Sequence, residues 1–346
     1  MKTSTDNPHI SVCIPVYKTE PYLAQCLASV FKQDYDSFEI VIVNDASTGR
    51  DSRGWKAKKI IRHAHKEGNS WRRKQGLSAI KVNYSEHSEN RGIMEVRRTL
   101  TYEAKGQYCL HLDSDDELTP DALSLLWQTN QNLGPFDIIH GSFNSGWYDE
   151  NGKFISTDET KCGAITYGKI ENHDVFHKWL FYEISGNVCA KLIRRDLFLR
   201  AYENITYSEC NLADDFLIFF FVSLFAKSYF GIENKIYLYR VTSGMTSENK
   251  IDSLKSWKLI CSAASVFTVI SEWIKDNPSD CKIITEEEMS KLKEQGRYYL
   301  VSSLIQLNDV VLPALQPQAY EMLCEYWGKD LVERMNSYHY NSRKSK

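Results

Sequence analysis

The chain has 346 residues, of which 42% are hydrophobic, 12% aromatic and 25% charged, and its formal net charge is −3. This balance excludes a disordered chain and a surface tuned as a whole to nucleic acid, and the length fits one large domain with an appendage, or two domains. The nine cysteines form no CxxC pair. An odd set of scattered cysteines without a signal peptide predicts reduced thiols and a cytoplasmic protein.

The first half of the chain alternates strand and helix patterns. Apolar, β-branched runs predict strands over residues 10–17, 38–45, 80–86, 107–113 and 136–143. Caps, prolines and apolar stripes predict helices that begin at Thr19-Glu20-Pro21, cover 93–104, and run from Thr119-Pro120-Asp121 through Trp127. This alternation predicts a mostly parallel sheet covered on both faces, with ligands at the carboxyl ends of its strands.

A basic segment interrupts this alternation. Residues 53–74 hold nine Lys and Arg and two His against one Glu. Charge runs are usually solvated faces, which favours a solvated helix and loop. The alternative is an insertion that contacts an anionic acceptor or a membrane surface.

The second half of the chain is mainly helical. Residues 144–154 are turn-rich and predict a hairpin over the sheet edge. Helical patterns follow over residues 175–184, 212–226, 257–274, 292–311 and 319–335. The longest apolar run, FLIFFFVSLFA (216–226), has 11 residues, too few to span a bilayer. We therefore expect a domain over 1–249 and a helical C-terminal subdomain over 250–346.

An acidic turn follows the fourth predicted strand. In HLDSDDEL (111–118), Asp113 and Asp115 flank one residue, and such carboxylates can present oxygens to Mg²⁺ or Mn²⁺. An EF-hand loop starting at Asp113 is excluded, because Leu118 and Ser124 stand where Gly and Glu are required. Glu117 likewise replaces the Thr or Val of a phosphatase DxDx(T/V) signature.

These motifs occur in one order with others. ISVCIPVYKTEPYLAQCLASVFKQDYDSFEIVIVNDAST is followed by ENRGIMEVRRTL, AKGQYCLHLDSDDELTPDAL, NVCAKLIRRDLF and LADDFLIFF. From about residue 9 to 247 the sequence resembles the family 2 glycosyltransferases with the GT-A fold, an α/β mixed sheet flanked by helices. It departs from the family in the basic segment, in Asn44 where many members have Asp, and in Asp214 where many have Glu.

The resemblance implies a site for a nucleotide. Pro15, Val16, Tyr17 and Asp45 would hold the base, with Tyr17 stacking on a pyrimidine and Asp45 accepting from the N–H of a uracil. Glu20 would lie nearby or cap the first helix.

The resemblance also implies how the diphosphate is held. Arg97 would reach Asp45 or the diphosphate, and Asp113 and Ser114 would lie at the ribose or a metal-bound water. Asp115 would ligate Mn²⁺ or Mg²⁺ together with the phosphates of a UDP-sugar. Asp116 would fix the loop or approach the donor sugar, and Glu117 would be turn surface.

The implied reaction is transfer of a hexose or N-acetylhexosamine to a sugar hydroxyl of a growing bacterial surface glycan, with inversion. Asp215 would be the general base, although two adjacent acids at a helix N-terminus are also stabilised by the helix dipole alone. The acceptor would be an oligosaccharide or a lipid-linked glycan. Contact with the inner face of the cytoplasmic membrane, through the basic tail SRKSK (342–346), and a homodimer through the C-terminal helices stay open.

Two other functions are compatible with parts of this pattern. A catalytically silent scaffold of a polysaccharide assembly complex would bind the sugar nucleotide without turnover. A nucleotidyltransferase that makes sugar nucleotides would need a Gly-rich, basic loop after the first strand, and VYKTEPYL (16–23) has none.

Overall fold

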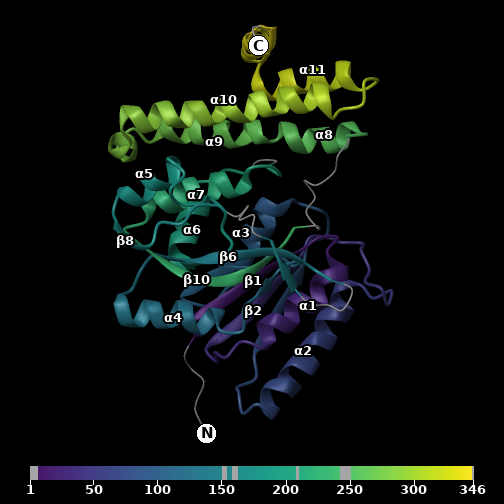
Figure 1. Cartoon of the computed structure of the whole chain (residues 1–346), viewed down its shortest axis with the longest axis vertical. Coiled ribbons are helices and arrows are strands. Elements are labelled where there is room, and N and C mark those ends of the chain that lie inside the picture. Colours follow the sequence, from purple (N-terminus) through teal and green to yellow (C-terminus); the bar gives the residue numbers. More distant parts are fainter. Residues whose placement is uncertain (1–6, 150–153, 158–162, 208–209, 242–250, 345–346) are drawn as a thin grey trace. The chain divides into compact units, whose positions relative to one another are not determined.

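The computed structural model (Figure 1) describes residues 7–149, 154–157, 163–207, 210–241 and 251–344. Contacts divide the chain into a sheet unit, Met1–Glu203 with Ile218–Ser243, and a helical unit, Asn204–Leu217 with Gly244–Lys346. By these contacts, residues 204–217 group with the C-terminal helices. The predicted domain boundary at residue 250 stays a prediction.

Ten strands of the described residues form one mixed sheet in the order β3-β2-β1-β4-β9-β6-β10-β5, with β7 paired to β6 and β8 to β10. They are β1 (Ile10–Val16), β2 (Phe38–Asn44), β3 (Lys81–Glu86), β4 (Tyr108–His111), β5 (Glu117–Leu118), β6 (Ile138–Tyr148), β7 (Phe154–Ser156), β8 (Gly168–Glu171), β9 (Lys191–Arg194) and β10 (Ser228–Arg240). The α/β mixed sheet implied by the resemblance is confirmed. The mostly parallel sheet predicted from the strand–helix alternation is wrong, because five of the nine strand pairings among the described residues are antiparallel.

The first four strands of that order are parallel, and their registers fix the edge where a ligand would bind. Val16 of β1 lies opposite Asn44 of β2, and Cys13 of β1 lies opposite His111 of β4. The residues that follow these strands therefore meet at one edge of the sheet. The predicted meeting of strand ends is confirmed.

Helices cover both faces of this sheet (Figure 1). They are α1 (Glu20–Phe31), α2 (Ala57–Lys74), α3 (Ile93–Glu103), α4 (Ala122–Leu133), α5 (Asp174–Leu180), α6 (Arg195–Glu203) and α7 (Asp214–Phe225), whose first four residues belong to the helical unit. The alternate residues Ile10, Val12 and Ile14 bury their side chains in one core with α1, α2 and α4. His111 points to the opposite face, where its ring meets Phe198 of α6.

Two details of the sheet unit refine the predictions. The turn-rich segment forms the expected hairpin, since β6 pairs with β7 in antiparallel register. The acidic turn, in contrast, ends in a short strand that the sequence pattern did not predict: Leu118 and Glu117 of β5 pair with Tyr237 and Leu238 of β10. Two residues are too few to show an alternating pattern.

The helical unit contains α8 (Leu254–Cys261), α9 (Ala263–Asp276), the short 3₁₀ helix η1 (Asp280–Ile283), α10 (Glu286–Asp309), α11 (Gln316–Trp327) and α12 (Lys329–Lys344). A capping box of Thr285 and Glu288 starts α10. The predicted helix over 319–335 is wrong in one respect, because Gly328 at φ 82° ends α11 before α12 begins.

The core of this unit is built around Trp257, which is fully buried and donates its indole N–H to the carbonyl of Ala319 over 2.8 Å. The run Leu254–Asp276 is long and apolar enough, by composition, to cross a membrane, but half of its most apolar window is buried. A buried core helix passes the same test. The side chains of the basic tail lie outside the described residues.

Candidate active site

The loop after β1 starts the site. Pro15 and Val16 are buried, and Tyr17 lies half-buried just beyond the strand. Lys18 follows in the left-handed region at φ 58°, where its N–H donates to Ser47 Oγ over 2.8 Å. Its ammonium lies 5.3 Å from the centroid of the Tyr17 ring. The loops after β1 and β2 are thus tied together beside this ring.

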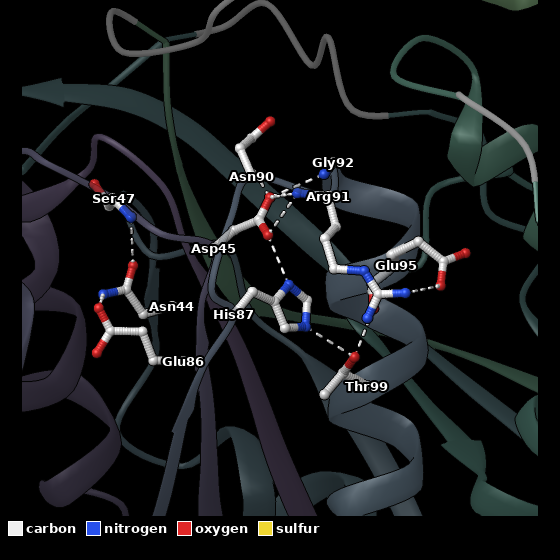
Figure 2. A network of polar contacts seen from close by, with 10 residues as sticks. All are labelled: Asn44, Asp45, Ser47, Glu86, His87, Asn90, Arg91, Gly92, Glu95 and Thr99. Carbon is white, nitrogen blue, oxygen red and sulfur yellow. Dashed lines mark hydrogen bonds and ion pairs between the residues drawn. The ribbon is translucent and has the colours of Figure 1, made fainter.

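Asp45, directly after β2, is the centre of a polar network (Figure 2). Its carboxylate is 1% exposed and accepts from four partners. Oδ1 accepts from His87 Nδ1 over 2.6 Å, and Oδ2 accepts from Asn90 Nδ2 over 2.8 Å. The backbone N–H groups of Arg91 and Gly92, which precede α3, also donate to it, the shortest distances being 2.9 Å. Asp45 therefore holds the start of α3 against the end of β2.

His87 joins Asp45 to helix α3 (Figure 2). Its Nδ1 lies 2.6 Å from Asp45 Oδ1, and its Nε2 lies 3.1 Å from Thr99 Oγ1. The Thr99 hydroxyl also lies 2.9 Å from the carbonyl of Glu95, one turn earlier in α3. Both ring nitrogens of His87 are therefore used in holding the end of β2 to α3.

Asn44 explains one departure from the family pattern. Its Oδ1 accepts from the N–H of Ser47 over 2.9 Å, while its Nδ2 donates to Tyr84 Oη over 3.2 Å and to Glu86 Oε1 over 3.4 Å. A carboxylate at this position would repel Glu86, whereas the amide donates to it.

Glu20 begins α1 and is completely buried, and neither carboxylate oxygen has a hydrogen-bond partner among the described residues. A Cβ placed on Gly49 would lie 1.9 Å from Glu20 Oε2, so the loop after β2 closes over this carboxylate. Thr19 makes no side-chain cap bond, and its hydroxyl instead lies 2.6 Å from Ser114 Oγ. The alternative cap role of Glu20 is therefore wrong, because its carboxylate makes no cap bond in the described part of the chain. Its place near the nucleotide stays a prediction.

The acidic turn is held by the protein's own cations and hydroxyls. Arg97, which is 4% exposed, lies with its guanidinium 3.3 Å from Asp113 Oδ1. The Cys189 thiol donates to the other oxygen of Asp113 over 3.5 Å. The backbone N–H of Asp113 donates to Tyr237 Oη over 3.1 Å, and this hydroxyl donates to Asp116 over 2.8 Å. Tyr237 of β10 therefore bridges both ends of the turn.

Arg240, the last residue of β10, is the second cation at the turn. Its backbone N–H donates to Asp116 Oδ1 over 2.8 Å, and its Nε donates to the carbonyl of Asp115 over 3.0 Å. Asp116 thus fixes the loop, and burial followed by the nearby Asp115 carboxylate raises its pKa well above the ordinary range.

Glu117 is not turn surface. It lies 3.7 Å from the Arg240 guanidinium and accepts a hydrogen bond from the Tyr148 hydroxyl. Burial raises the pKa of Glu117, while Tyr148 and Arg240 act in the opposite direction. The Glu117 side chain is half-buried because β5 pairs with β10. Local sequence could not indicate this pairing.

The acidic turn fits a divalent ion that takes few ligands from the protein and the others from the bound substrate. Asp115 is half-buried in the turn, and no group of three His, Cys, Asp or Glu side chains suited to a metal occurs in the described ranges. Mg²⁺-type sites are commonly built from one or two carboxylates and the phosphates of a nucleotide. Asp115 would hold such an ion with the diphosphate.

Asp214 and Asp215 form the first turn of α7, in the part of that helix that belongs to the helical unit. Both are half-buried, and they follow Ala213, which adopts φ 64°. Burial, then the charges of these two acids, raises the pKa of the Cys210 thiol. Strain at Ala213 sets the direction in which α7 begins.

A comparison with known families identifies the chain. The family model described as Glycosyl transferase family 2 matches residues 11–198. The chain belongs to this family. Among similar proteins, the glycosyltransferase GlyG of Streptococcus pneumoniae serotype 4 (strain TIGR4) is 28% identical over 273 residues, 77% of this chain and 80% of GlyG. The glycosyltransferase GlyA of the same strain is 28% identical over 242 residues, 69% of this chain, which spans 31% of GlyA.

Solved structures show the same fold. The crystal structure of Staphylococcus aureus TarS 1–349 in complex with UDP-GlcNAc superimposes with a TM-score of 0.53 and 16% sequence identity, and the match covers 96% of this chain and 92% of that one. The chain is therefore a family 2 glycosyltransferase with the GT-A fold and a helical C-terminal region.

Proposed function

We propose that this glycosyltransferase moves a hexose or N-acetylhexosamine from a UDP-sugar to a sugar hydroxyl of a growing surface glycan. One observation carries the proposal: the adjacent parallel strands β2, β1 and β4 are followed by Asp45, by Tyr17, and by the acidic turn with Asp113. The UDP-GlcNAc bound to TarS, which has the same fold, supports a UDP-sugar as donor.

In this proposal Tyr17 stacks on the uracil. The base then lies between Pro15 and Val16 of β1 on one side and the loop after β2 on the other. Asp45 accepts from the uracil N–H, which requires one of its four present donors to yield. Glu20 lies beneath this pocket.

Arg97 orients Asp113 for the ribose and the diphosphate, with Ser114 beside it. Asp115 holds Mn²⁺ or Mg²⁺ with the phosphates, and the ion when bound neutralises charge on the departing UDP.

Asp215 is proposed as the general base that accepts the proton of the acceptor hydroxyl. The resemblance implies Asp215 as the one base and implies no nucleophilic carboxylate for a covalent intermediate, which favours a single displacement with inversion. We propose an oligosaccharide or lipid-linked glycan as acceptor and the cytoplasm as the place of reaction. A homodimer through the helices of the helical unit stays a prediction.

A screen for UDP release over common UDP-sugars with Mn²⁺, with and without candidate acceptors, tests the proposal. Wild-type protein should release UDP from at least one donor, and Asp115→Ala or excess chelator should abolish the release. Asp34→Asn, an exposed acid of the same unit, should leave it unchanged. UDP binding without hydrolysis or transfer over the whole panel would contradict the proposal and favour a silent scaffold.

A further inference from the structure

The basic segment around α2 is charged unlike the rest of the chain. Residues 53–74 contain nine of the 42 Lys and Arg residues and one of the 45 acidic residues, a formal charge of +8. Because the chain as a whole carries −3, the remaining residues together carry −11. Charge separated to this degree points to a surface that meets an anionic partner.

One side of α2 is used by the core. Ala57, Ile60 and Ile61 are buried on it, and Arg72 is completely buried. The Arg72 guanidinium donates to three main-chain carbonyls beyond α1, namely those of Phe31 (3.2 Å), Gln33 (2.8 Å) and Tyr35 (2.8 Å). Arg72 therefore ties α2 to the sheet unit and is unavailable to a partner.

The other side of α2 carries a cationic face, with most of its charges on residues 58–66 and two more at Arg73 and Lys74. We define this face by its exposed residues Lys58, Lys59, Arg62, His63, Lys66, Arg73 and Lys74. At about 100° per residue they fall within an arc of about 160°, and they extend over about 24 Å of helix. Glu67, at the margin of this arc, is the one acidic residue of the helix.

Few of these charges are neutralised within the chain. Lys59 lies 4.3 Å from the ring centroid of Trp55, which Arg53 covers as well at 4.0 Å. Across the described part of the chain, the other Lys and Arg residues of the cationic face form no ion pair: Lys58, Arg62, Lys66, Arg73 and Lys74.

We propose that the cationic face docks the sheet unit on an anionic phospholipid surface. The face lies along one helix, so its exposed cations can meet a layer of headgroups together. It includes no Trp, Tyr or Phe on which a base or a sugar could stack. Trp71 lies on the apolar side and is half-buried. The half-buried Trp55 ring is already covered by Arg53 and Lys59. Four to eight basic residues on one helix face are the usual signature of anionic lipid binding.

The contact is electrostatic and does not insert the helix. Since the apolar side of α2 is buried in the core, no hydrophobic face remains to enter the acyl layer. Binding then depends on ionic strength, because charges at a surface are screened within about 8 Å at physiological salt. This docking is independent of the proposed reaction, and its failure would leave that reaction untouched.

Co-sedimentation of the full chain with vesicles tests the proposal. Wild-type protein should bind vesicles of 7:3 phosphatidylcholine and phosphatidylglycerol and dissociate from them in high salt. It should not bind vesicles of pure phosphatidylcholine. Each basic residue contributes about fivefold to such partitioning, so Lys58→Gln/Arg62→Gln/Lys66→Gln should bind about a hundredfold more weakly.

A matched triple variant of the helical unit, Lys275→Gln/Lys293→Gln/Arg297→Gln, removes the same charge from exposed positions and should bind like wild type. Circular dichroism confirms that both variants are folded. Three results would overturn the proposal: no binding to anionic vesicles, equal losses in the two variants, or binding through α2 to soluble polyphosphate but not to vesicles.

Discussion

His87 and Asp45 form a buried hydrogen-bonded pair, with 2.6 Å between Nδ1 and Oδ1. His87 comes directly after β3, and Asp45 directly after β2. The pair therefore joins two strand ends at the edge where the nucleotide is proposed to bind. Because Asp45 also accepts from the N–H groups that precede α3, a change at His87 should affect the loop before α3 as well as the pair itself.

Replacing His87 by Gln should lower the free energy of unfolding by about 2 kcal/mol. The amide group of Gln cannot place one nitrogen against Asp45 and another against Thr99 as the imidazole ring does, and a hydrogen bond to a carboxylate contributes about 1.5–3 kcal/mol. Urea unfolding measures this loss. His63→Gln, which changes an exposed histidine of α2, should stay within about 0.5 kcal/mol of wild type. Equal stability of the two variants would show that the pair contributes nothing.

The Tyr237 hydroxyl should be needed for the geometry of the acidic turn. Tyr237→Phe leaves the N–H of Asp113 and an oxygen of Asp116 without their shared partner, at a cost of about 2 kcal/mol. Urea unfolding should detect this, and affinity for UDP with Mn²⁺ should fall with it. Tyr102→Phe, at a tyrosine that is 52% exposed, is the control and should change neither quantity. If the affinity for UDP is unchanged while the free energy of unfolding falls, the geometry of the turn does not control donor binding.

Buried neutral histidines should make the fold sensitive to acid. Burial first, and Arg97 second, lower the pKa of His111 to about 3, while burial and Lys191 lower the pKa of His140. Between pH 6.5 and 3 the unfolded chain binds a proton at His111 that the native chain does not, and the shift of His140 acts in the same direction. Their contribution to stability is thus complete above pH 6.5 and is lost as the pH falls below it, for His111 by about 1.4 kcal/mol per pH unit.

His111→Leu tests this directly, since neither ring nitrogen of His111 has a hydrogen-bond partner among the described residues. Between pH 7 and 5 the variant should lose about 2 kcal/mol less unfolding free energy than wild type. His63→Gln, at an exposed histidine of α2, is the control and should follow the wild-type pH curve. A His111→Leu curve parallel to wild type would refute the assignment.

Local sequence predicted the parts of the site that follow strands. Apolar runs that end in Tyr17, Asp45 and Asp113 predicted the ends of β1, β2 and β4 to within two residues, and parallel registers then bring these ends together. The resemblance to a known family supplied roles that spacing alone could not.

The residues that hold the acidic turn could not be predicted in the same way. Tyr237 and Arg240 bond to Asp116 across 121 and 124 residues of chain. Only the pairing of β10 with β5 brings them there, and a two-residue strand leaves no pattern. His87 was missed for a related reason, since its partner Asp45 lies 42 residues away on a neighbouring strand. The sequence signal for His87 was its place as a polar residue directly after a predicted strand. Many turns have a polar residue in this place.

The most direct test of the proposed reaction is the turnover of Asp215→Asn beside its binding of UDP. The proposal predicts that the variant binds UDP like wild type and transfers sugar at least about a hundredfold more slowly, the typical contribution of a general base. Asp214→Asn, the adjacent acid in the same turn of α7, should keep most of the activity. Near-normal transfer by Asp215→Asn, with UDP binding intact, would contradict Asp215 as the base.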